Sequence, residues 1–149
     1  MITFNVGPSK IYPQVKQFLN DAYDQNILSI SHRSAAFDAF SKKCLELLHE
    51  KLEIPLDYTI LYTGSATESW EIIAQDIVKN KAVHFFNGEF GKKWHEYAKF
   101  INPATTGYKF DENEAIKLSD YQIDNDTEVL AFTLNETSTG TQVRESVID

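Results

Sequence analysis

The sequence predicts an α/β fold, in which a β-sheet is flanked by helices. Apolar residues recur at helical spacing in several stretches, and short β-branched and aromatic runs lie between these stretches. Glycine and asparagine residues separate the two kinds of segment. Alternating strands and helices are best accommodated by a sheet with helices on its faces, and 149 residues are enough for one domain with a hydrophobic core.

Two helices are expected in the first third of the chain. Pro13 opens the first helix, because proline is tolerated at the first helical position, and helical spacing continues to about Asp24. Residues 27–30 are predicted to be extended. The second helix covers residues 37–52, whose apolar side chains share one face. Cys44 lies on that face and is predicted to belong to the core.

Strands and helices are expected to alternate along the rest of the chain. The predicted segments are strands at residues 58–63, 82–86, 105–110 and 128–134, helices at residues 68–78 and around residues 94–100, and a short helix at residues 118–121. Residues 135–140 are predicted to form a loop, and residues 143–149 to begin another element. We therefore expect the chain to stop before the architecture is complete.

Charge and cysteine content restrict the partners and the compartment. The 14 basic and 22 acidic residues give a net charge of −8, which repels polyphosphate backbones, so no nucleic-acid partner is expected. The single cysteine excludes an internal disulfide and favours the cytoplasm. The amino terminus lacks the pattern of a signal peptide, and no segment approaches membrane-spanning length, so no membrane association is expected. No histidine or cysteine shows metal-ligand spacing, so no metal is expected.

Two glycine-containing turns, each between a predicted strand and a helix, are the first candidate sites. In Gly64-Ser65-Ala66-Thr67, small residues leave the backbone amides open to an anion such as phosphate, although simple helix capping by Ser65 explains the turn as well. In Gly88-Glu89-Phe90-Gly91, the ring of Phe90 could stack on a planar ligand. The alternative for Phe90 is an aromatic residue that fills the core.

Two polar segments are further candidates. His32 and Arg33 lie in Ser31-His32-Arg33-Ser34 and could bind an anionic group through charge-assisted hydrogen bonds. The alternative is a helix entry that is capped by Ser34, with Arg33 in a surface ion pair. Asn135-Glu136-Thr137 follows a predicted strand, at the sheet edge where open α/β folds place ligands, although turn formation explains it equally well.

Taken together, these segments resemble the class V aminotransferases, which depend on pyridoxal phosphate. The resemblance extends from about Phe4 to Val143, and phosphoserine aminotransferases are the most similar members. It implies the amino-terminal part of the fold-type I transferase fold, similar to aspartate aminotransferase, with a mixed sheet flanked by helices. The motifs that match in order and spacing are Gly7-Pro8-Ser9, Ser31-His32-Arg33-Ser34, Gly64-Ser65-Ala66-Thr67, Gly88-Glu89-Phe90-Gly91 and Asn135-Glu136-Thr137.

The resemblance assigns expected roles to individual residues. It implies that Ser65, Ala66 and Thr67 hold the cofactor phosphate, that Phe90 stacks on the pyridine ring, and that Thr137 forms a hydrogen bond near the ring's phenolic oxygen. His32 and Arg33 resemble the pair that faces the substrate in this family. Residues 1–30 would form an arm and a helix, and residues 31–149 would form part of the large cofactor-binding domain.

The resemblance also implies what lies outside this chain. The family's Schiff-base lysine and the aspartate that pairs with the pyridine nitrogen fall beyond Asp149, so no catalytic residue is assigned here. We therefore expect the 149-residue chain alone to be inactive. The complete protein is expected to transfer an amino group between glutamate and an oxo acid such as 3-phosphohydroxypyruvate, in serine biosynthesis. As in other family members, we expect it to be a homodimer.

Two alternatives remain open. Phosphoserine aminotransferases usually have tryptophan where this chain has Phe90, which keeps open alanine–glyoxylate, serine–pyruvate or cysteine-desulfurase chemistry on the same cofactor. A non-catalytic binding fragment that retains an anion-binding turn is the alternative of another class.

Overall fold

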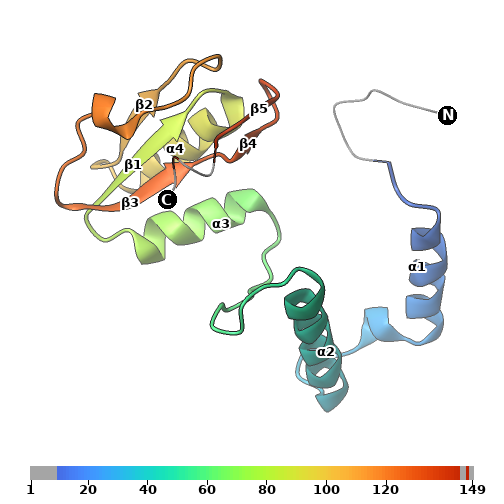
Figure 1. Ribbon diagram of the computed structural model, residues 1–149. Helices are drawn as coiled ribbons and strands as arrows, with labels where there is room; N and C mark the ends of the chain where they lie inside the picture. Colours follow the sequence, from blue (N-terminus) through green and yellow to red (C-terminus); the bar gives the residue numbers. More distant parts are fainter. Residues whose placement is uncertain (1–9, 145–146, 148–149) are drawn as a thin grey trace. The chain divides into compact units, whose positions relative to one another are not determined.

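The computed structural model describes residues 10–144 and residue 147, and the chain divides into two compact units, Met1–Leu61 and Tyr62–Asp149 (Figure 1). We call these unit 1 and unit 2. The motif Gly7-Pro8-Ser9 lies outside the described residues, as do four of the seven residues from 143 to 149, where a further element was predicted.

Residues 10–61 of unit 1 form two helices and one short turn of 3₁₀-helix. Helix α1 spans Gln14–Asp24, which confirms the first predicted helix, and α2 spans Ala35–Lys51, close to the second. The prediction that residues 27–30 are extended is wrong, because Ile27–Ser29 form a 3₁₀ turn, η1. Asn26 precedes this turn with φ of 58°, a left-handed conformation that asparagine tolerates better than most residues.

In the described part of unit 1, residues 10–61, the apolar side chains are half-buried or exposed. Neither α1 nor α2 buries a residue fully, and Phe18 on α1 has 64% of its surface exposed. Cys44, which was predicted to belong to the core, is only half-buried. Exposed apolar surface of this extent is typical of a region that another chain segment or a partner covers.

Unit 2 holds the sheet and most of the predicted strand and helix alternation. The predicted strand at residues 58–63, at the boundary of the two units, does not form, and Leu61 and Tyr62 are exposed. A strand needs a neighbour that pairs with its backbone groups, and these residues have none within the described chain. The elements of unit 2 are α3 (Ala66–Ile72), the π-helical turn η2 (Ile73–Ile77), β1 (Lys81–Phe86), α4 (Glu89–Ile101), β2 (Thr106–Lys109), the 3₁₀ turn η3 (Leu118–Asp120), β3 (Thr127–Phe132), β4 (Asn135–Glu136) and β5 (Thr141–Gln142).

The sheet of unit 2 has three parallel strands in the order β2-β1-β3. Val83 of β1 pairs with Thr106 of β2 on one side and with Leu130 of β3 on the other. Among the strands that the structure describes, antiparallel pairing occurs in the separate hairpin of β4 and β5. The α/β fold with helices flanking a sheet is therefore confirmed, and Figure 1 shows the sheet with α3 and α4.

One face of β1 packs into an aromatic core. Val83 and Phe85 are almost fully buried and form a cluster with Ile116 and Val143. The ring of Phe85 stacks on the ring of Phe132, with 5.0 Å between their centroids. This cluster anchors the long connection between β2 and β3, because Ile116 comes from that connection.

The opposite face of β1 packs against α4. The buried ring of His84 meets the Trp94 ring edge to face at 5.1 Å, and Trp94 stacks on Trp70 of α3 at 5.9 Å. His95 lies over β2, where a Cβ added to Gly107 would come within 2.6 Å of the imidazole ring. Gly107 therefore allows α4 to pack closely on the sheet.

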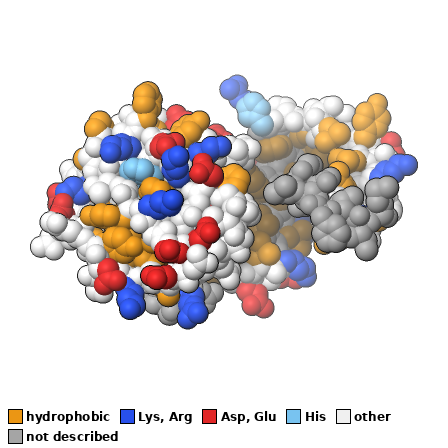
Figure 2. Space-filling view, turned by 90° about the horizontal axis from the view of Figure 1, so that it is seen from above, with side chains coloured by type: hydrophobic (Ala, Val, Ile, Leu, Met, Phe, Trp, Pro, Cys, Tyr) orange, Lys and Arg blue, Asp and Glu red, His pale blue; other side chains and the backbone are white. Residues whose placement is uncertain are grey.

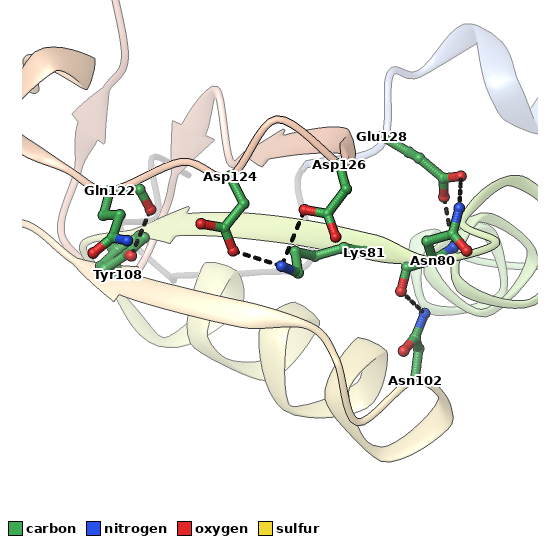
Figure 3. Close-up of polar contacts among 8 residues, drawn as sticks. All are labelled: Asn80, Lys81, Asn102, Tyr108, Gln122, Asp124, Asp126 and Glu128. Atoms are coloured by element: carbon green, nitrogen blue, oxygen red, sulfur yellow. Dashed lines mark hydrogen bonds and ion pairs between the residues drawn. The ribbon is translucent and has the colours of Figure 1, made fainter.

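The amino end of the sheet is held by polar contacts, which Figure 3 shows. Lys81 donates to Asp124 at 2.5 Å and to Asp126 at 3.1 Å, and the hydrogen bonds to these two carboxylates raise the pKa of Lys81. The Glu128 carboxylate accepts from the backbone amide of Asn80 at 2.8 Å and from the preceding amide at 2.7 Å. These contacts join the start of β1 to the segment that leads into β3.

The buried imidazole of His84 predicts a pH-dependent stability. Burial, and next the neighbouring His95, lower the pKa of His84 to about 4. Unfolding therefore takes up a proton as the pH falls below the ordinary histidine pKa of about 6.5. We expect His84 to contribute a loss of about 2–3 kcal/mol in the free energy of unfolding between about pH 6.5 and about pH 4. Urea denaturation followed by tryptophan fluorescence measures this loss.

The control for this prediction is His84→Leu, which removes the titrating group and places an apolar side chain at the same position of β1. Its free energy of unfolding should fall less steeply than that of the unmodified protein between about pH 6.5 and about pH 5. Equal slopes in the two proteins would contradict the prediction.

Candidate functional site

Two segments meet at the carboxyl end of the sheet. Residues 87–91 follow β1 and begin α4, whereas residues 135–142 follow β3 and form the hairpin of β4 and β5. Because β1 and β3 are parallel neighbours, their carboxyl ends lie at the same edge. Figure 1 shows the hairpin at this end of unit 2. Side-chain hydrogen bonds then tie the two segments together.

The carboxylate of Glu136 is the main tie between the segments. Glu136 is 1% exposed, and it accepts hydrogen bonds from the backbone amides of Gly91 at 2.9 Å and Phe90 at 3.4 Å. It also accepts from the amide and hydroxyl of Ser138 at 3.1 and 2.5 Å. The Ser138 hydroxyl in turn accepts from the amide of Glu89 at 2.8 Å. The first three backbone amides of α4 are thus satisfied from the hairpin.

This arrangement explains the charge of Glu136. Burial raises the pKa of its carboxyl group, but the hydrogen bonds from Ser138, Gly91 and Phe90 outweigh burial, so the pKa lies below its ordinary value. The ionised carboxylate also lies at the amino end of a helix, where a negative charge is favoured. We call the contacts of Glu136 and Ser138 with residues 89–91 the Glu136 clamp.

Glycines make the close approach in the Glu136 clamp possible. A Cβ added to Gly88 would lie 2.4 Å from Cγ of Glu136 and from the hydroxyl of Ser138. A Cβ added to Gly91 would lie 2.7 Å from Cβ of Phe86. Both glycines of the Gly88-Glu89-Phe90-Gly91 motif are therefore required by packing, and neither has a positive φ.

A second tie joins the same two segments. Asn87 is buried and donates through its side-chain amide to the hydroxyl of Thr141 at 2.8 Å. The hydroxyls of Thr141 and Thr139 are 2.8 Å apart and share a hydrogen bond. The hairpin is thus held to residues 87–91 at both of its ends.

Phe90 and Thr137 are exposed beside the Glu136 clamp. Phe90 has 45% of its surface exposed, and no ring–ring contact of Phe90 occurs among the described aromatic residues. The alternative in which Phe90 fills the core therefore does not hold. Thr137 lies between the two clamped residues Glu136 and Ser138, and it lines a shallow hollow of about 230 Å³ on the hairpin.

The Gly64-Ser65-Ala66-Thr67 segment leads into α3 and is capped by its own side chains. Ser65 is the N-cap residue, and its hydroxyl accepts from the amide of Glu68 at 3.1 Å. The Glu68 carboxylate accepts from the amide of Gly64. Ser65 therefore caps the helix, as the alternative predicted. Ser65, Ala66 and Thr67 are nevertheless all exposed to solvent. The amides of Ala66 and Thr67 have no hydrogen-bond partner among the described residues.

His32 and Arg33 belong to unit 1, whereas the other candidate residues belong to unit 2. Ser34 caps α2, because its hydroxyl accepts from the amide of Phe37 at 3.1 Å. The helix-entry alternative is thus correct for Ser34. Arg33, however, forms no ion pair with any residue that the structure describes, and both His32 and Arg33 are exposed. Their role in a site remains a prediction.

The sequence-based reasoning missed Glu136, Ser138 and Asn87. It singled out Asn135-Glu136-Thr137 for the amide and hydroxyl groups, and it predicted a loop where β4 and its hairpin form. Glu136 reaches partners that are 45 and 46 residues away, so no local pattern marks it. The one available signal is the pair of glycines around Phe90, because each leaves room for a close neighbour.

Neither a cluster of metal ligands nor a membrane-spanning helix is present among the described residues. Among residues 10–144 and 147, no group of three or more histidine, cysteine, aspartate or glutamate side chains is placed to hold a metal ion. No helix in the described ranges is long and apolar enough to cross a membrane. On the face drawn in Figure 2, basic and acidic side chains are interspersed.

Comparison with known proteins gives the family. The family model of class-V aminotransferases matches residues 3–147, which is almost the whole chain. The chain belongs to the class-V aminotransferase family. The resemblance inferred from the motifs is thus confirmed.

Similar proteins are longer than this chain. A phosphoserine aminotransferase of Lysinibacillus sphaericus is 30% identical over 154 residues, which cover 95% of this chain and 42% of that protein. The crystal structure of a phosphoserine aminotransferase from Cytophaga hutchinsonii matches with a TM-score of 0.87 and 35% identity, over 95% of this chain and 39% of that one. A phosphoserine aminotransferase from Bacillus circulans subsp. alkalophilus matches with a TM-score of 0.71 and 25% identity, over 89% of this chain and 40% of that one. The chain therefore spans about two fifths of the length of these relatives.

The packing around Gly88 predicts that a single methyl group disrupts the Glu136 clamp. Gly88→Ala should reduce the free energy of unfolding by about 1–3 kcal/mol, because its Cβ overlaps Glu136 and Ser138. It should also accelerate hydrogen exchange of the amides of residues 89–91. Chemical denaturation and exchange followed by NMR measure the two effects.

Gly140→Ala is the matched control for this prediction. Gly140 has φ of 71° and no atom within 4 Å of an added Cβ, so only backbone strain of about 1 kcal/mol is expected there. The amides of residues 89–91 should exchange as in the unmodified protein. Similar exchange at residues 89–91 in the two variants would count against the packing argument.

Proposed function

We propose that the complete gene product is a pyridoxal-phosphate-dependent aminotransferase that transfers an amino group between glutamate and an oxo acid. The proposed oxo acid is 3-phosphohydroxypyruvate, which would place the protein in serine biosynthesis. The main observation behind the proposal is that Phe90 and Thr137 are exposed next to the Glu136 clamp, at the carboxyl edge of the sheet. The chain that carries this arrangement belongs to the class-V family. The names of similar proteins support the same activity.

The exposed groups of unit 2 fit the cofactor. Pyridoxal phosphate has a flat ring, a phenolic oxygen and a phosphate group. Phe90 offers a partly exposed ring that makes no ring–ring contact with the described aromatic residues, and Thr137 offers an exposed hydroxyl on the hairpin clamped to the Phe90 segment. Ser65 and Thr67 offer hydroxyls, and two backbone amides at the start of α3 have no partner among the described residues. These are the groups that bind a ring and an anion.

Each of these residues would then contribute binding and orientation. Phe90 would pack its ring against the cofactor ring, and Thr137 would hydrogen-bond near the phenolic oxygen. Ser65, Ala66 and Thr67 would hold the phosphate, assisted by the amino end of the helix. When bound, the cofactor supplies an electron sink for the substrate carbon that loses its proton. The proton transfer itself would need a general base, and we assign none to this chain, so we propose that residues 1–149 alone are inactive.

His32 and Arg33 are proposed to bind the substrate. Both side chains are exposed, and Arg33 keeps its guanidinium free of ion pairs among the described residues. A planar guanidinium forms paired hydrogen bonds with phosphate and carboxylate groups, and a histidine can add a further donor. This chemistry supports an anionic substrate such as a phosphorylated oxo acid.

The remaining parts of the proposal concern assembly and location. The exposed apolar residues of α1, such as Phe18 and Leu19, support a homodimer, because such surfaces commonly mark interfaces. The single cysteine supports a cytoplasmic location. We also propose that residues 1–30 form an arm and a helix, and that residues 31–149 form part of the large cofactor-binding domain.

Two alternatives are separated by simple observations. Phe90 in place of tryptophan favours other class-V chemistry, such as that of alanine–glyoxylate or serine–pyruvate aminotransferases or cysteine desulfurases. A non-catalytic binding fragment is favoured if the reading frame stops after codon 149. A frame that continues into a lysine-bearing segment supports the enzyme.

Substrate profiling tests the proposed activity. The complete gene product, loaded with pyridoxal phosphate, should convert 3-phosphohydroxypyruvate and glutamate to phosphoserine and 2-oxoglutarate. Arg33→Gln should raise KM for 3-phosphohydroxypyruvate about tenfold, because it removes charge-assisted hydrogen bonds to the phosphate. Steady-state kinetics with coupled detection of 2-oxoglutarate measures both effects.

Parallel assays with glyoxylate and pyruvate as acceptors, and alanine and serine as donors, provide the comparison. Turnover of these substrates without turnover of 3-phosphohydroxypyruvate would rule out the proposed substrate and leave the cofactor assignment standing.

The cofactor assignment predicts a second result. Phe90→Ala and Thr137→Ala in the complete gene product should each weaken retention of pyridoxal phosphate, by about tenfold in dissociation constant, because each removes one ligand-facing contact. Thr137 is exposed and Phe90 has 45% of its surface exposed, so the free energy of unfolding should fall by less than about 1 kcal/mol in Thr137→Ala and by about 1–3 kcal/mol in Phe90→Ala. Unchanged retention in both variants, measured by dialysis and absorbance, would refute the two assignments.

A further inference from the structure

Glu136 is a charged residue that is almost fully buried, with 1% of its surface exposed. Its four hydrogen-bond donors come from the first turn of α4 and from Ser138. A buried carboxylate with this many donors is strongly held, because removing any partner leaves an unpaired group in the interior. The side chain therefore fixes the distance between α4 and the hairpin.

The two groups proposed to face the cofactor are attached directly to this clamp. Phe90 supplies one of the amides that Glu136 binds, and Thr137 follows Glu136 in the chain. Ser138, on the other side of Thr137, binds both Glu136 and the amide of Glu89. The backbone on both sides of Thr137 is therefore tied to the backbone that carries the Phe90 ring.

We propose that Glu136 is a positioning residue, whose buried carboxylate holds the ring of Phe90 and the hydroxyl of Thr137 in one fixed arrangement for a phosphorylated aromatic ligand. The inference rests on the proposed function, because it assigns Glu136 to the same cofactor site. Glu136 itself does not touch the ligand, since its oxygens are occupied by Phe90, Gly91 and Ser138. Fixing the two contacts in advance lowers the entropic cost of binding.

The Glu136 carboxylate also occupies the amino end of α4. The amides of residues 89–91 would otherwise form an anion site, since they are the unpaired donors at the start of a helix. Glu136 and Ser138 bind all three of them. The phosphate of the ligand is thereby directed away from α4.

The chain offers a matched control at the opposite end of the sheet. Glu128 also accepts from two successive backbone amides, at 2.7 and 2.8 Å, and from the side chain of Asn80 at 2.7 Å (Figure 3). It lies at the amino edge of β1 and β3, away from Phe90 and Thr137. Glu128→Gln therefore removes a similar set of hydrogen bonds without touching the proposed site.

The test compares Glu136→Gln with Glu128→Gln in the complete gene product. Glutamine keeps the size of the side chain but replaces one carboxylate oxygen by an NH₂ group. This donor then faces the backbone N–H of Gly91 or Phe90, and that hydrogen bond is lost. Glu136→Gln should weaken binding of pyridoxal phosphate about tenfold and speed up amide exchange at Phe90 and Gly91. Glu128→Gln should change the dissociation constant by less than about twofold and speed up exchange at Lys79 and Asn80 instead.

Circular dichroism of the bound cofactor separates positioning from mere stability. Pyridoxal phosphate is achiral, so its dichroism arises from the asymmetric site that holds it. Glu136→Gln should reduce this signal per bound cofactor, whereas Glu128→Gln should leave it unchanged. Equal dichroism and equal affinity in the two variants would overturn the role of Glu136, while binding by the unmodified protein would still support the proposed function.

Two other outcomes are also decisive. If the unmodified protein does not bind pyridoxal phosphate, the proposed function fails, and the positioning role fails with it. If Glu136→Gln does not fold, Ser138→Ala replaces it, because that variant removes only the hydroxyl between Glu136 and the amide of Glu89. A reduced cofactor signal in Ser138→Ala supports the inference, and an unchanged signal overturns it.

Discussion

The parallel pairing of β1 with a strand on each side is the constraint on which unit 2 depends. A central parallel strand has both faces covered, and β1 meets this requirement with two different layers. Val83 and Phe85 pack into the aromatic cluster, whereas Ala82 and His84 lie on the face next to α4. This packing places a histidine in the interior. Burial lowers the pKa of His84 to about 4, so its imidazole is neutral near pH 7. The same packing fixes the helix firmly on the sheet.

The same pairing divides the polar residues between the two ends of the sheet. At the amino end, Lys81 and Glu128 join the start of β1 to the segment that leads into β3. These contacts are exposed to solvent, and each contributes little to the free energy of unfolding. At the carboxyl end, Glu136 makes buried contacts that are more costly to break. Since parallel strands bring their carboxyl ends to one edge, segments that are about 46 residues apart meet there. The candidate site is therefore a consequence of strand direction.

The sequence predicted the elements whose signals are local. Helix α4 follows from its apolar spacing, and β1 follows from its short β-branched and aromatic run. Residues 58–63 carry a strand-like pattern but form no strand, because strand formation depends on a pairing partner as well as on composition. Phe90 and Thr137 became candidates because of their positions in loops after predicted strands, and the family resemblance then gave each an expected role. Glu136 was not identified, because its partners are distant in the chain and only the fold brings them together.

Two helix starts in unit 2 could bind an anion, and their hydrogen bonds distinguish them. At α4, the hairpin supplies a carboxylate and a hydroxyl that satisfy residues 89–91. At α3, Ser65 and Glu68 bind the amides of Glu68 and Gly64, which leaves those of Ala66 and Thr67 available. A phosphate would displace an internal carboxylate at α4, whereas at α3 it would add bonds to exposed donors. These hydrogen bonds support the proposal that residues 65–67 hold the phosphate, on physical grounds that are separate from family resemblance.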